Sequence, residues 1–405
     1  MRIAFISIHG YVDPVPKLGL TDTGGQVVYV IEMAKHLAKL GINIDIFTRL
    51  FEGRGRIEYV SKKVRIIRIP CGPDMFLRKE ELYPYLDEYS ENLTRFVANE
   101  SLRYDIIHSH YWDAGYVALK LKEKLNVPIA HTSHSLGLIK RLFLGELGKK
   151  VDYRFEIRIN IEKKILAEAD LIVSASPVEQ EYVSRLYGIN RKFEVVPPGV
   201  DTKYFSPENV MNIKLPEKYI FTTGRFEWTK GFDLLVRAFP YVVMEHSDVY
   251  LIVGGGSLKP THIEKQVREE IWRIAREGKV EKNIIQTGRI PNEELPTYYA
   301  KSALTVLPSR YDLFGMVAIE ALACGRPVVV SKYAGAHRMI GRYGLIADPF
   351  DEKDLASKIL WLLDHPEKAN KMGIEGRKFV EKNMSWEALA KKLLSIYRSF
   401  LESEG

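Results

Sequence analysis

Short apolar runs recur along the first half of the chain and are separated by longer stretches of mixed polarity. The runs occupy residues 2–8, 42–48, 66–69, 105–108, 128–132 and 171–174. The stretches between them have the period of amphipathic helices, most clearly at residues 26–40, 80–99 and 154–169. Because nearly continuous apolar strands are buried on both faces, this order predicts a parallel sheet with helices on either side.

The same order of strands and helices begins again in the second half. Its apolar runs are residues 219–223, 249–253, 284–287, 304–307 and 328–331. Proline and glycine interrupt regular structure between the halves, at Pro197-Pro198-Gly199-Val200-Asp201. We therefore predict an α/β protein with two Rossmann-like, doubly wound parallel-sheet domains facing a central cleft. The predicted domains are residues 1–200 and 201–384, and a C-terminal helix at 385–405 could pack back on the first.

Composition and charge fit a globular protein with anionic ligands. A chain of 405 residues allows two domains, each with its own core. Hydrophobic residues make up 46% and charged residues 27%, which speaks against a disordered chain. The formal net charge of +7 suits phosphates, but a membrane surface, nucleic acid or simply a solvated surface would explain it equally well.

Cysteines and apolar segments restrict the compartment. Cys71 and Cys324 are the only cysteines, so no disulfide framework or cysteine metal site is expected, and a reducing compartment is favoured. The apolar N-terminus ends at His9-Gly10 and is too short for a signal peptide. No run approaches the ~18 apolar residues of a membrane span. We expect a cytoplasmic protein.

Candidate chemistry begins at the first helix, which follows Asp22-Thr23-Gly24-Gly25-Gln26. Glycines at a helix start leave backbone N–H groups open to an anion. Taken alone, however, a pair of glycines is equally well explained as a simple loop.

Two further motifs belong to the second domain. Arg225 follows Gly224 at the end of the first strand, and Lys230 is expected to open the next helix. The two cations could hold a diphosphate, although a surface pair near a turn would look the same. The segment Asp312-Leu313-Phe314-Gly315-Met316 opens another helix, whose start can receive phosphate oxygens.

Asp312 and Glu320 could also suggest the carboxylate pair of a glycoside hydrolase. Eight helical residues separate two side chains by roughly 12 Å, whereas a hydrolase pair needs about 5–9.5 Å. The spacing therefore speaks against a hydrolase. Inside a helix, Glu320 could instead accept hydrogen bonds from a ribose.

Triple glycine and paired histidines give weaker signals. Val253-Gly254-Gly255-Gly256-Ser257 lacks the spaced third glycine of a dinucleotide fingerprint, so we interpret it as a tight turn near a nucleotide base. His131 and His134 could suggest a metal, but no third ligand has a suitable spacing. We expect one of them in the cleft and the other buried, and we expect neither a metal nor a cofactor.

Together these residues resemble the donor-binding pattern of retaining glycosyltransferases with the GT-B fold, of the family 4 type. The resemblance covers nearly the whole chain. Several N-terminal segments narrow it to the sucrose-phosphate synthase branch, namely residues 22–26, 79–86, 110–115 and 134–137 together with Lys140.

This resemblance implies a hexosyltransferase that moves glucose from UDP-glucose to fructose 6-phosphate with retention of configuration, giving sucrose 6-phosphate. The implied donor-binding residues are Gly24, Gly25, Gly224, Arg225, Lys230, Phe314, Gly315, Met316 and Glu320. The implied acceptor-binding residues are Gly25, Gln26, Lys79, Tyr111, Asp113, Lys140 and Arg158. The implied catalytic residues are Arg225, Lys230, His134 and Asp312.

Two departures from the family pattern leave the identity of the donor open. The chain has Asp312-Leu313 where the family has Glu-Pro, and Gly335-Ala336-His337-Arg338-Met339 where the family has Gly-Gly-Pro-x-Glu. Both lie near the expected donor sugar. The family's same-face mechanism needs positive charge around the leaving diphosphate rather than a nucleophile, and Arg225, Lys230 and the helix start at Gly315 would supply it.

Other functions remain as alternatives. A transferase of the same fold that uses a UDP-, GDP- or ADP-sugar and a lipid-linked or glycan acceptor would need a basic and apolar face, such as Lys140-Arg141-Leu142-Phe143-Leu144. A non-catalytic sugar-nucleotide-binding protein would fit Asp312. Nucleic acid is not expected as a partner, because only the net charge favours it. The expected partners are thus a nucleotide-sugar donor and a sugar-phosphate acceptor, and membrane association is not favoured.

Overall fold

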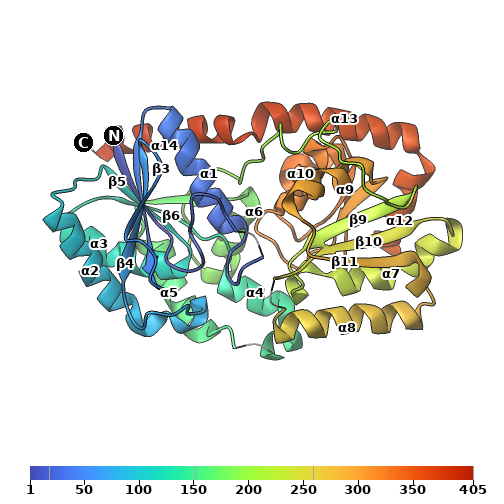
Figure 1. Cartoon of the computed structure of the whole chain (residues 1–405), viewed down its shortest axis with the longest axis horizontal. Coiled ribbons are helices and arrows are strands. Elements are labelled where there is room, and N and C mark those ends of the chain that lie inside the picture. Colours follow the sequence, from blue (N-terminus) through green and yellow to red (C-terminus); the bar gives the residue numbers. More distant parts are fainter. Residues whose placement is uncertain (18, 151, 259, 405) are drawn as a thin grey trace. The chain divides into compact units, whose positions relative to one another are not determined.

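The computed structural model describes residues 1–17, 19–150, 152–258 and 260–404, and the chain divides into two compact units (Figure 1). Unit 1 comprises Met1–Arg141, Asp152–Pro197 and Trp386–Gly405, and unit 2 comprises Leu142–Val151 and Pro198–Ser385. Each unit is built on a mainly or wholly parallel sheet with helices, so the predicted α/β fold class with two Rossmann-like domains is confirmed. The sequence did not predict that Leu142–Val151 belongs to unit 2.

Unit 1 is built on an eight-stranded sheet among the described residues, in the order β3-β4-β2-β1-β5-β6-β7-β8. The strands are β1 (Arg2–Ile6), β2 (Asn43–Leu50), β3 (Ile57–Ser61), β4 (Val64–Pro70), β5 (Ile106–His110), β6 (Ile129–Thr132), β7 (Leu171–Ser174) and β8 (Glu194–Val195). Only β3 runs antiparallel to its neighbour in this described sheet. Since β1 lies between β2 and β5, the chain reverses its direction of winding there, and ligands bind at such a switch point.

Helices and short helical turns connect these strands. The helices of unit 1 are α1 (Gly25–Lys39), α2 (Leu86–Asn99), α3 (Trp112–Leu125), α5 (Phe155–Glu168), α6 (Pro177–Tyr182) and α14 (Trp386–Glu404), and α4 (Gly137–Leu144) runs from unit 1 into unit 2. The helix predicted at residues 80–99 is wrong over its first part, where 3₁₀ turns at Lys79–Glu81 and Tyr83–Tyr85 precede α2. Proline in this segment, Pro84, lacks the N–H that a continuous helix requires.

Helix α14 completes the core of unit 1 although it follows unit 2 in the sequence. It packs on α1, and Figure 1 draws the two helices side by side. Its buried side chains share one cluster with β1, β2 and α1, and they are Trp386, Leu389, Ala390, Leu393, Leu394 and Tyr397. The hydroxyl of Tyr397 also lies 2.5 Å from Nδ1 of His108 on β5.

Unit 2 contains a parallel sheet in the order β11-β10-β9-β12-β13-β14. Its strands are β9 (Tyr219–Gly224), β10 (Tyr250–Gly255), β11 (Ile284–Gly288), β12 (Leu304–Leu307), β13 (Val328–Ser331) and β14 (Gly344–Ala347). Its further helices are α7 (Phe232–Glu245), α8 (His262–Glu277), α9 (Leu295–Lys301), α10 (Met316–Ala323), α11 (His337–Ile340), α12 (Glu352–Asp364) and α13 (Pro366–Asn383). The switch point is again the first strand, because β9 lies between β10 and β12.

Within the described residues, none of the helices is both long and apolar enough to cross a bilayer.

The basic and apolar segment at α4 offers little free apolar surface. Its Phe143 ring packs against Tyr311 and Tyr333, with ring centroids 6.0 and 4.9 Å apart, and Leu144 is buried. Leu142 alone of these three side chains is exposed.

We expect Gly231→Ala to destabilise unit 2 beyond the strain of its backbone. Gly231 has φ +68, and a Cβ there would lie 2.0 Å from the carbonyl oxygen of Pro308. Gly288 has φ +72 but open space around the Cβ position, so Gly288→Ala is the matched control. Overpacking of this kind costs about 1–3 kcal/mol, or roughly 2–12 °C in Tm beyond the control. Equal melting temperatures of the two variants would contradict the close approach.

Candidate active site

In each unit, the predicted site residues lie in the segments that follow the carboxyl ends of parallel strands. In unit 1 these segments follow β1, β4, β5 and β6, with Lys79 after β4, and in unit 2 they follow β9 and β12. Because the strands are parallel and adjacent, residues far apart in the sequence come to the same edge of each sheet. The candidate residues of each unit are described by themselves.

The loop between β1 and α1 holds Lys79 through an acidic side chain. Asp22, with φ +53, accepts hydrogen bonds from the side chain of Lys79 and, at 3.0 Å, from its backbone N–H. Burial is the largest single influence on Asp22 and opposes its ionisation, but nearby positive charge, that of Lys79 first, and the two hydrogen bonds from Lys79 together outweigh burial and lower the pKa of the carboxyl well below its usual range. A charged Lys79 is therefore fixed beside the segment that leads into Gly24 and Gly25.

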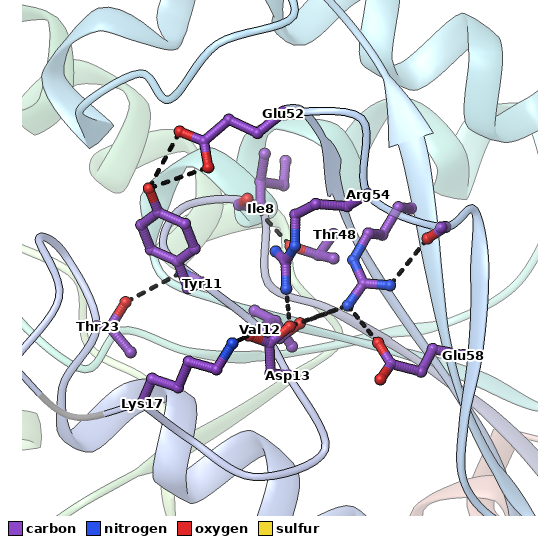
Figure 2. A network of polar contacts seen from close by, with 12 residues as sticks. Ile8, Tyr11, Val12, Asp13, Lys17, Thr23, Thr48, Glu52, Arg54 and Glu58 are labelled. Atoms are coloured by element: carbon purple, nitrogen blue, oxygen red, sulfur yellow. Dashed lines mark hydrogen bonds and ion pairs between the residues drawn. The ribbon is translucent and has the colours of Figure 1, made fainter.

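The same loop is anchored to the sheet by a partly buried polar network (Figure 2). Asp13 forms ion pairs with Arg54 and, at 3.0 Å, with Arg68, and Arg68 lies 2.7 Å from Glu58. Nearby, the backbone N–H of Tyr11 donates to Thr23 Oγ1 over 3.0 Å. Buried charges are stable only when they are paired, so this network fixes where the loop passes.

At the start of α1, Gln26 links two strand ends. Its side-chain amide donates to Ser7 Oγ over 3.2 Å and to the carbonyl oxygen of His110 over 3.3 Å. Gly24 and Gly25 precede it, and Gly25 is the first residue of α1. The helix start that the sequence associated with an anion is thus held against the ends of β1 and β5.

A buried histidine and a buried aspartate form a pair that the sequence analysis did not identify. His9 Nδ1 lies 2.7 Å from Asp113 Oδ2, and both side chains are almost fully buried. The ring of Tyr111, which has φ +82 and precedes α3, meets the His9 ring edge to face at 4.7 Å. The predicted residues Tyr111 and Asp113 therefore both contact His9.

The other histidines at this edge are neutral. Burial lowers the pKa of His131 and of His134 to about 3. His131 is buried and contacts Ser109, whereas His134 is partly exposed, has φ +54, and has its Nε2 3.0 Å from Nδ1 of His110. Despite this cluster, no group of three His, Cys, Asp or Glu suited to a metal occurs in the part of the chain that the structure describes.

The other two predicted acceptor-binding cations, like Lys79, have protein partners. Arg158 is buried, its Nε lies 2.6 Å from Glu162, and its guanidinium stacks 4.8 Å from the centre of the Tyr111 ring. Lys140 is also buried, with Nζ 3.9 Å from the centre of the Tyr153 ring. Arg158 thus packs against the Tyr111 ring and helps to hold it in place. Contact of Arg158 or Lys140 with an acceptor stays a prediction.

In unit 2 the two predicted diphosphate cations differ in their surroundings. Arg225 follows β9 directly, its side chain is 50% exposed, and it lies 2.8 Å from Glu227. Lys230 does not open a helix as predicted, because it ends a 3₁₀ turn and Gly231 separates it from α7. The Lys230 ammonium donates to Asp312 Oδ2 over 2.7 Å.

The loop before α10 brings Asp312 and Glu320 to this lysine. The backbone N–H of Asp312 donates a hydrogen bond to Tyr333, and its carbonyl oxygen accepts one from Gly335; both residues follow β13. The Oδ1 atom of Asp312 accepts a hydrogen bond from the N–H of Phe314 over 3.2 Å. Gly315, with φ +106, leads into Met316 and α10. Burial raises the pKa of Glu320, whose Oε2 accepts a 2.6 Å hydrogen bond from Tyr299, while attraction to Lys230 counteracts the rise. Lys230 is therefore within electrostatic reach of both carboxylates.

The triple glycine is a close backbone contact rather than a nucleotide fingerprint. Gly255 has φ +111, and a Cβ on it would lie 2.0 Å from the carbonyl oxygen of Gly224. Gly256 is equally confined, because its Cβ would meet Arg268 and Glu264 at 2.5 Å. The ends of β9 and β10 thus meet backbone to backbone beside Arg225.

Comparison with known families identifies the class of the protein. The family model of Glycosyltransferase Family 4 matches residues 23–204, and the model of Glycosyl transferases group 1 matches residues 208–379. The chain belongs to this family of glycosyltransferases and is a transferase enzyme, as its sequence predicted.

Individual relatives are similar over the whole chain. A mannosylfructose-phosphate synthase from Agrobacterium fabrum is 37% identical over 98% of this chain and 90% of its own length. A D-inositol 3-phosphate glycosyltransferase from Corynebacterium urealyticum is 33% identical over 98% of this chain and 96% of its own length. The solved sucrose-phosphate synthase of Thermosynechococcus elongatus has a TM-score of 0.87 and 31% identity, with 99% of both chains covered. The predicted likeness to sucrose-phosphate synthases is confirmed.

We expect Glu179→Gln to remove a pH dependence of the stability of unit 1. Glu179 is fully buried on α6, close to Tyr29, whose ring packs on His134. Burial raises the pKa of Glu179 from 4.5 to about 7. Because the folded protein holds this proton more tightly than the unfolded chain does, the protonated carboxyl stabilises the fold. This stabilisation is complete below the ordinary pKa of 4.5 and is lost as the pH rises through about 7. The loss amounts to on the order of 3 kcal/mol.

The measurement is the free energy of unfolding at pH 5 and at pH 8. Relative to wild type, Glu179→Gln should gain stability between these values, whereas Glu168→Gln, at an exposed carboxyl of α5, should not. A difference between Glu179→Gln and wild type that is constant with pH would show that the buried carboxyl does not take up a proton.

Proposed function

We propose that this enzyme transfers a hexose from a nucleotide-sugar to a phosphorylated sugar, with retention of configuration. The favoured pair is UDP-glucose and fructose 6-phosphate. The observation that carries the proposal is a fixed cation in each unit at the carboxyl ends of the strands, Lys230 held by Asp312 and Lys79 held by Asp22. The names of all three relatives above contain a phosphate on a sugar or an inositol, and two of them denote products that contain fructose.

Unit 2 provides the groups for the donor. Lys230 and Arg225 bind the diphosphate, the N–H groups at the start of α10 add positive charge, and Glu320 accepts hydrogen bonds from the ribose. As the bond between the anomeric carbon and the diphosphate breaks, the acceptor oxygen bonds to that carbon on the same face, and the leaving phosphate oxygen, on which negative charge grows, takes the proton of the acceptor hydroxyl. Lys230 gives up part of its interaction with Asp312 when the diphosphate binds. Its positive charge is therefore already beside the leaving oxygen when the reaction begins.

Unit 1 provides the groups for the acceptor. Lys79 binds the phosphate of the acceptor, together with backbone N–H groups at Gly25 and the side chain of Gln26. Lys140 and Arg158 lie on α4 and α5 of the same half and add to its positive charge. Since Asp22 fixes the ammonium group of Lys79 in place, a phosphorylated acceptor is favoured over a neutral sugar.

The function is tested by nucleotide release from UDP-glucose and GDP-mannose. Each donor is mixed with fructose, fructose 6-phosphate or D-inositol 3-phosphate, and the product is analysed for its anomeric configuration. We expect the strongest release with UDP-glucose and fructose 6-phosphate, and little with fructose. Lys79→Ala should weaken the preference for fructose 6-phosphate over fructose about 10–100-fold, the value of one charged hydrogen bond.

Lys120→Ala is the matched control for this test. Lys120 is a partly exposed lysine of unit 1 that lies 2.7 Å from Asp87. An unchanged preference in Lys79→Ala would contradict the phosphate assignment. Release that depends on a lipid-linked or glycan acceptor instead would favour the alternative transferase, and nucleotide-sugar binding without any turnover would favour a binding protein.

We expect Lys230→Ala to lower kcat by about 10²–10³-fold, the usual cost of removing one donor to developing charge. Lys218→Ala is the control, because Lys218 forms an exposed ion pair with Asp248 in the same unit. Thermal melting of both variants shows that the fold is kept. A kcat of Lys230→Ala within a few-fold of the control would overturn the diphosphate assignment.

A further inference from the structure

We infer that His9 binds a hydroxyl group of the acceptor through its Nε2 atom, with Asp113 as the residue that positions the ring. Neither the motifs of the sequence nor the names of the relatives point to His9. The inference rests on the proposed function, since it assumes a sugar-phosphate acceptor in unit 1.

The contacts of Asp113 fix which nitrogen of His9 carries a proton. Oδ1 of Asp113 accepts the backbone N–H of Ala114 over 2.7 Å, and Oδ2 lies 2.7 Å from His9 Nδ1. An ionised carboxylate only accepts hydrogen bonds, so Nδ1 is the donor. In the neutral imidazole, Nε2 then holds the lone pair and accepts a hydrogen bond.

Nε2 is the one polar atom of this ring that the protein leaves for a ligand. Among the described residues, Nε2 has no hydrogen-bond partner. It is also absent from the fully buried polar atoms that lack a partner, so it keeps some contact with solvent. The ring cannot turn easily, because Asp113 holds one edge and Tyr111 packs against it at 4.7 Å. Arg158 in turn supports Tyr111.

His9 lies close to the cation assigned to the acceptor phosphate. The next residue, Gly10, approaches the backbone of Asp22 so closely that a Cβ on Gly10 would lie 2.4 Å from the Asp22 carbonyl oxygen. Asp22 is the residue whose side chain holds Lys79, so His9 stands beside the segment that fixes this lysine. In a sugar phosphate, hydroxyl groups lie a few bonds from the phosphate, so one acceptor can reach Lys79 and His9 together.

Two substitutions separate ligand binding from a purely structural hydrogen bond. Asparagine places an amide near the position of Nδ1 and can keep the bond to Asp113, but it has no atom at the position of Nε2. Glutamine reaches the position of Nε2 instead. His9→Asn should therefore raise the KM for fructose 6-phosphate about tenfold, the value of one hydrogen bond, while His9→Gln recovers part of the loss.

Monodeoxy analogues of fructose 6-phosphate provide the decisive test. In wild type, one analogue should be a poorer acceptor by about tenfold or more, because it leaves Nε2 without a partner. In His9→Asn the penalty for that one analogue should disappear, while the penalties for the others stay. Asp113→Asn should also raise the acceptor KM. His36→Asn is the matched control, since His36 bonds a backbone oxygen on α1 through Nδ1.

Failure of this inference and failure of the proposed function give different results. If wild type does not use fructose 6-phosphate, the proposed acceptor is wrong, and the same experiment is made with the acceptor that supports nucleotide release. If wild type uses it but His9→Asn keeps the wild-type KM and every deoxy penalty, His9 is structural and the inference is overturned. The inference would also be overturned if His9→Asn slowed hydrolysis of the donor in the absence of acceptor by the same factor as it slowed transfer, because the defect would then not concern the acceptor.

Discussion

In each unit a carboxylate fixes a lysine before any ligand arrives, and the phosphate binding proposed above depends on this constraint. Asp22 holds Lys79, and Asp312 holds Lys230. Both pairs are only partly exposed, so their attraction is less screened than that of a surface pair. In the proposed reaction this arrangement lowers the cost of reorganising the site, but each phosphate has to compete with a carboxylate for its lysine.

Much of the fold could be predicted because parallel strands buried on both faces leave a direct record in the sequence. The elements that escaped lack that record. Strand β3 is largely exposed, β8 has two residues, and β14 is an edge strand with Ile346 40% exposed. The apolar pattern could suggest that α14 packs on unit 1 but could not single out α1 as its partner, since amphipathic helices of this kind have many suitable partners.

The sequence identified the loops of the site better than the interactions inside them. Gly24, Gly25, Lys230 and Asp312 stand next to strand ends or helix starts, where local motifs are informative. His9 is separated from Asp113 by 104 positions and Lys79 from Asp22 by 57, so no local pattern marks either pair. The ion pair between Lys230 and Asp312 spans 82 positions, and for the same reason the sequence did not reveal that this aspartate holds the lysine.

The position of α14 has a consequence for synthesis on the ribosome. Unit 2 lies almost entirely in one continuous stretch, whereas the core of unit 1 includes Trp386 and Tyr397 from a helix that is translated after it. Until that helix emerges, the surface of α1 that it covers and the Nδ1 atom of His108 remain without the contacts that α14 supplies. The domain that is translated first is thus the one completed last, which reverses the usual order of folding during translation.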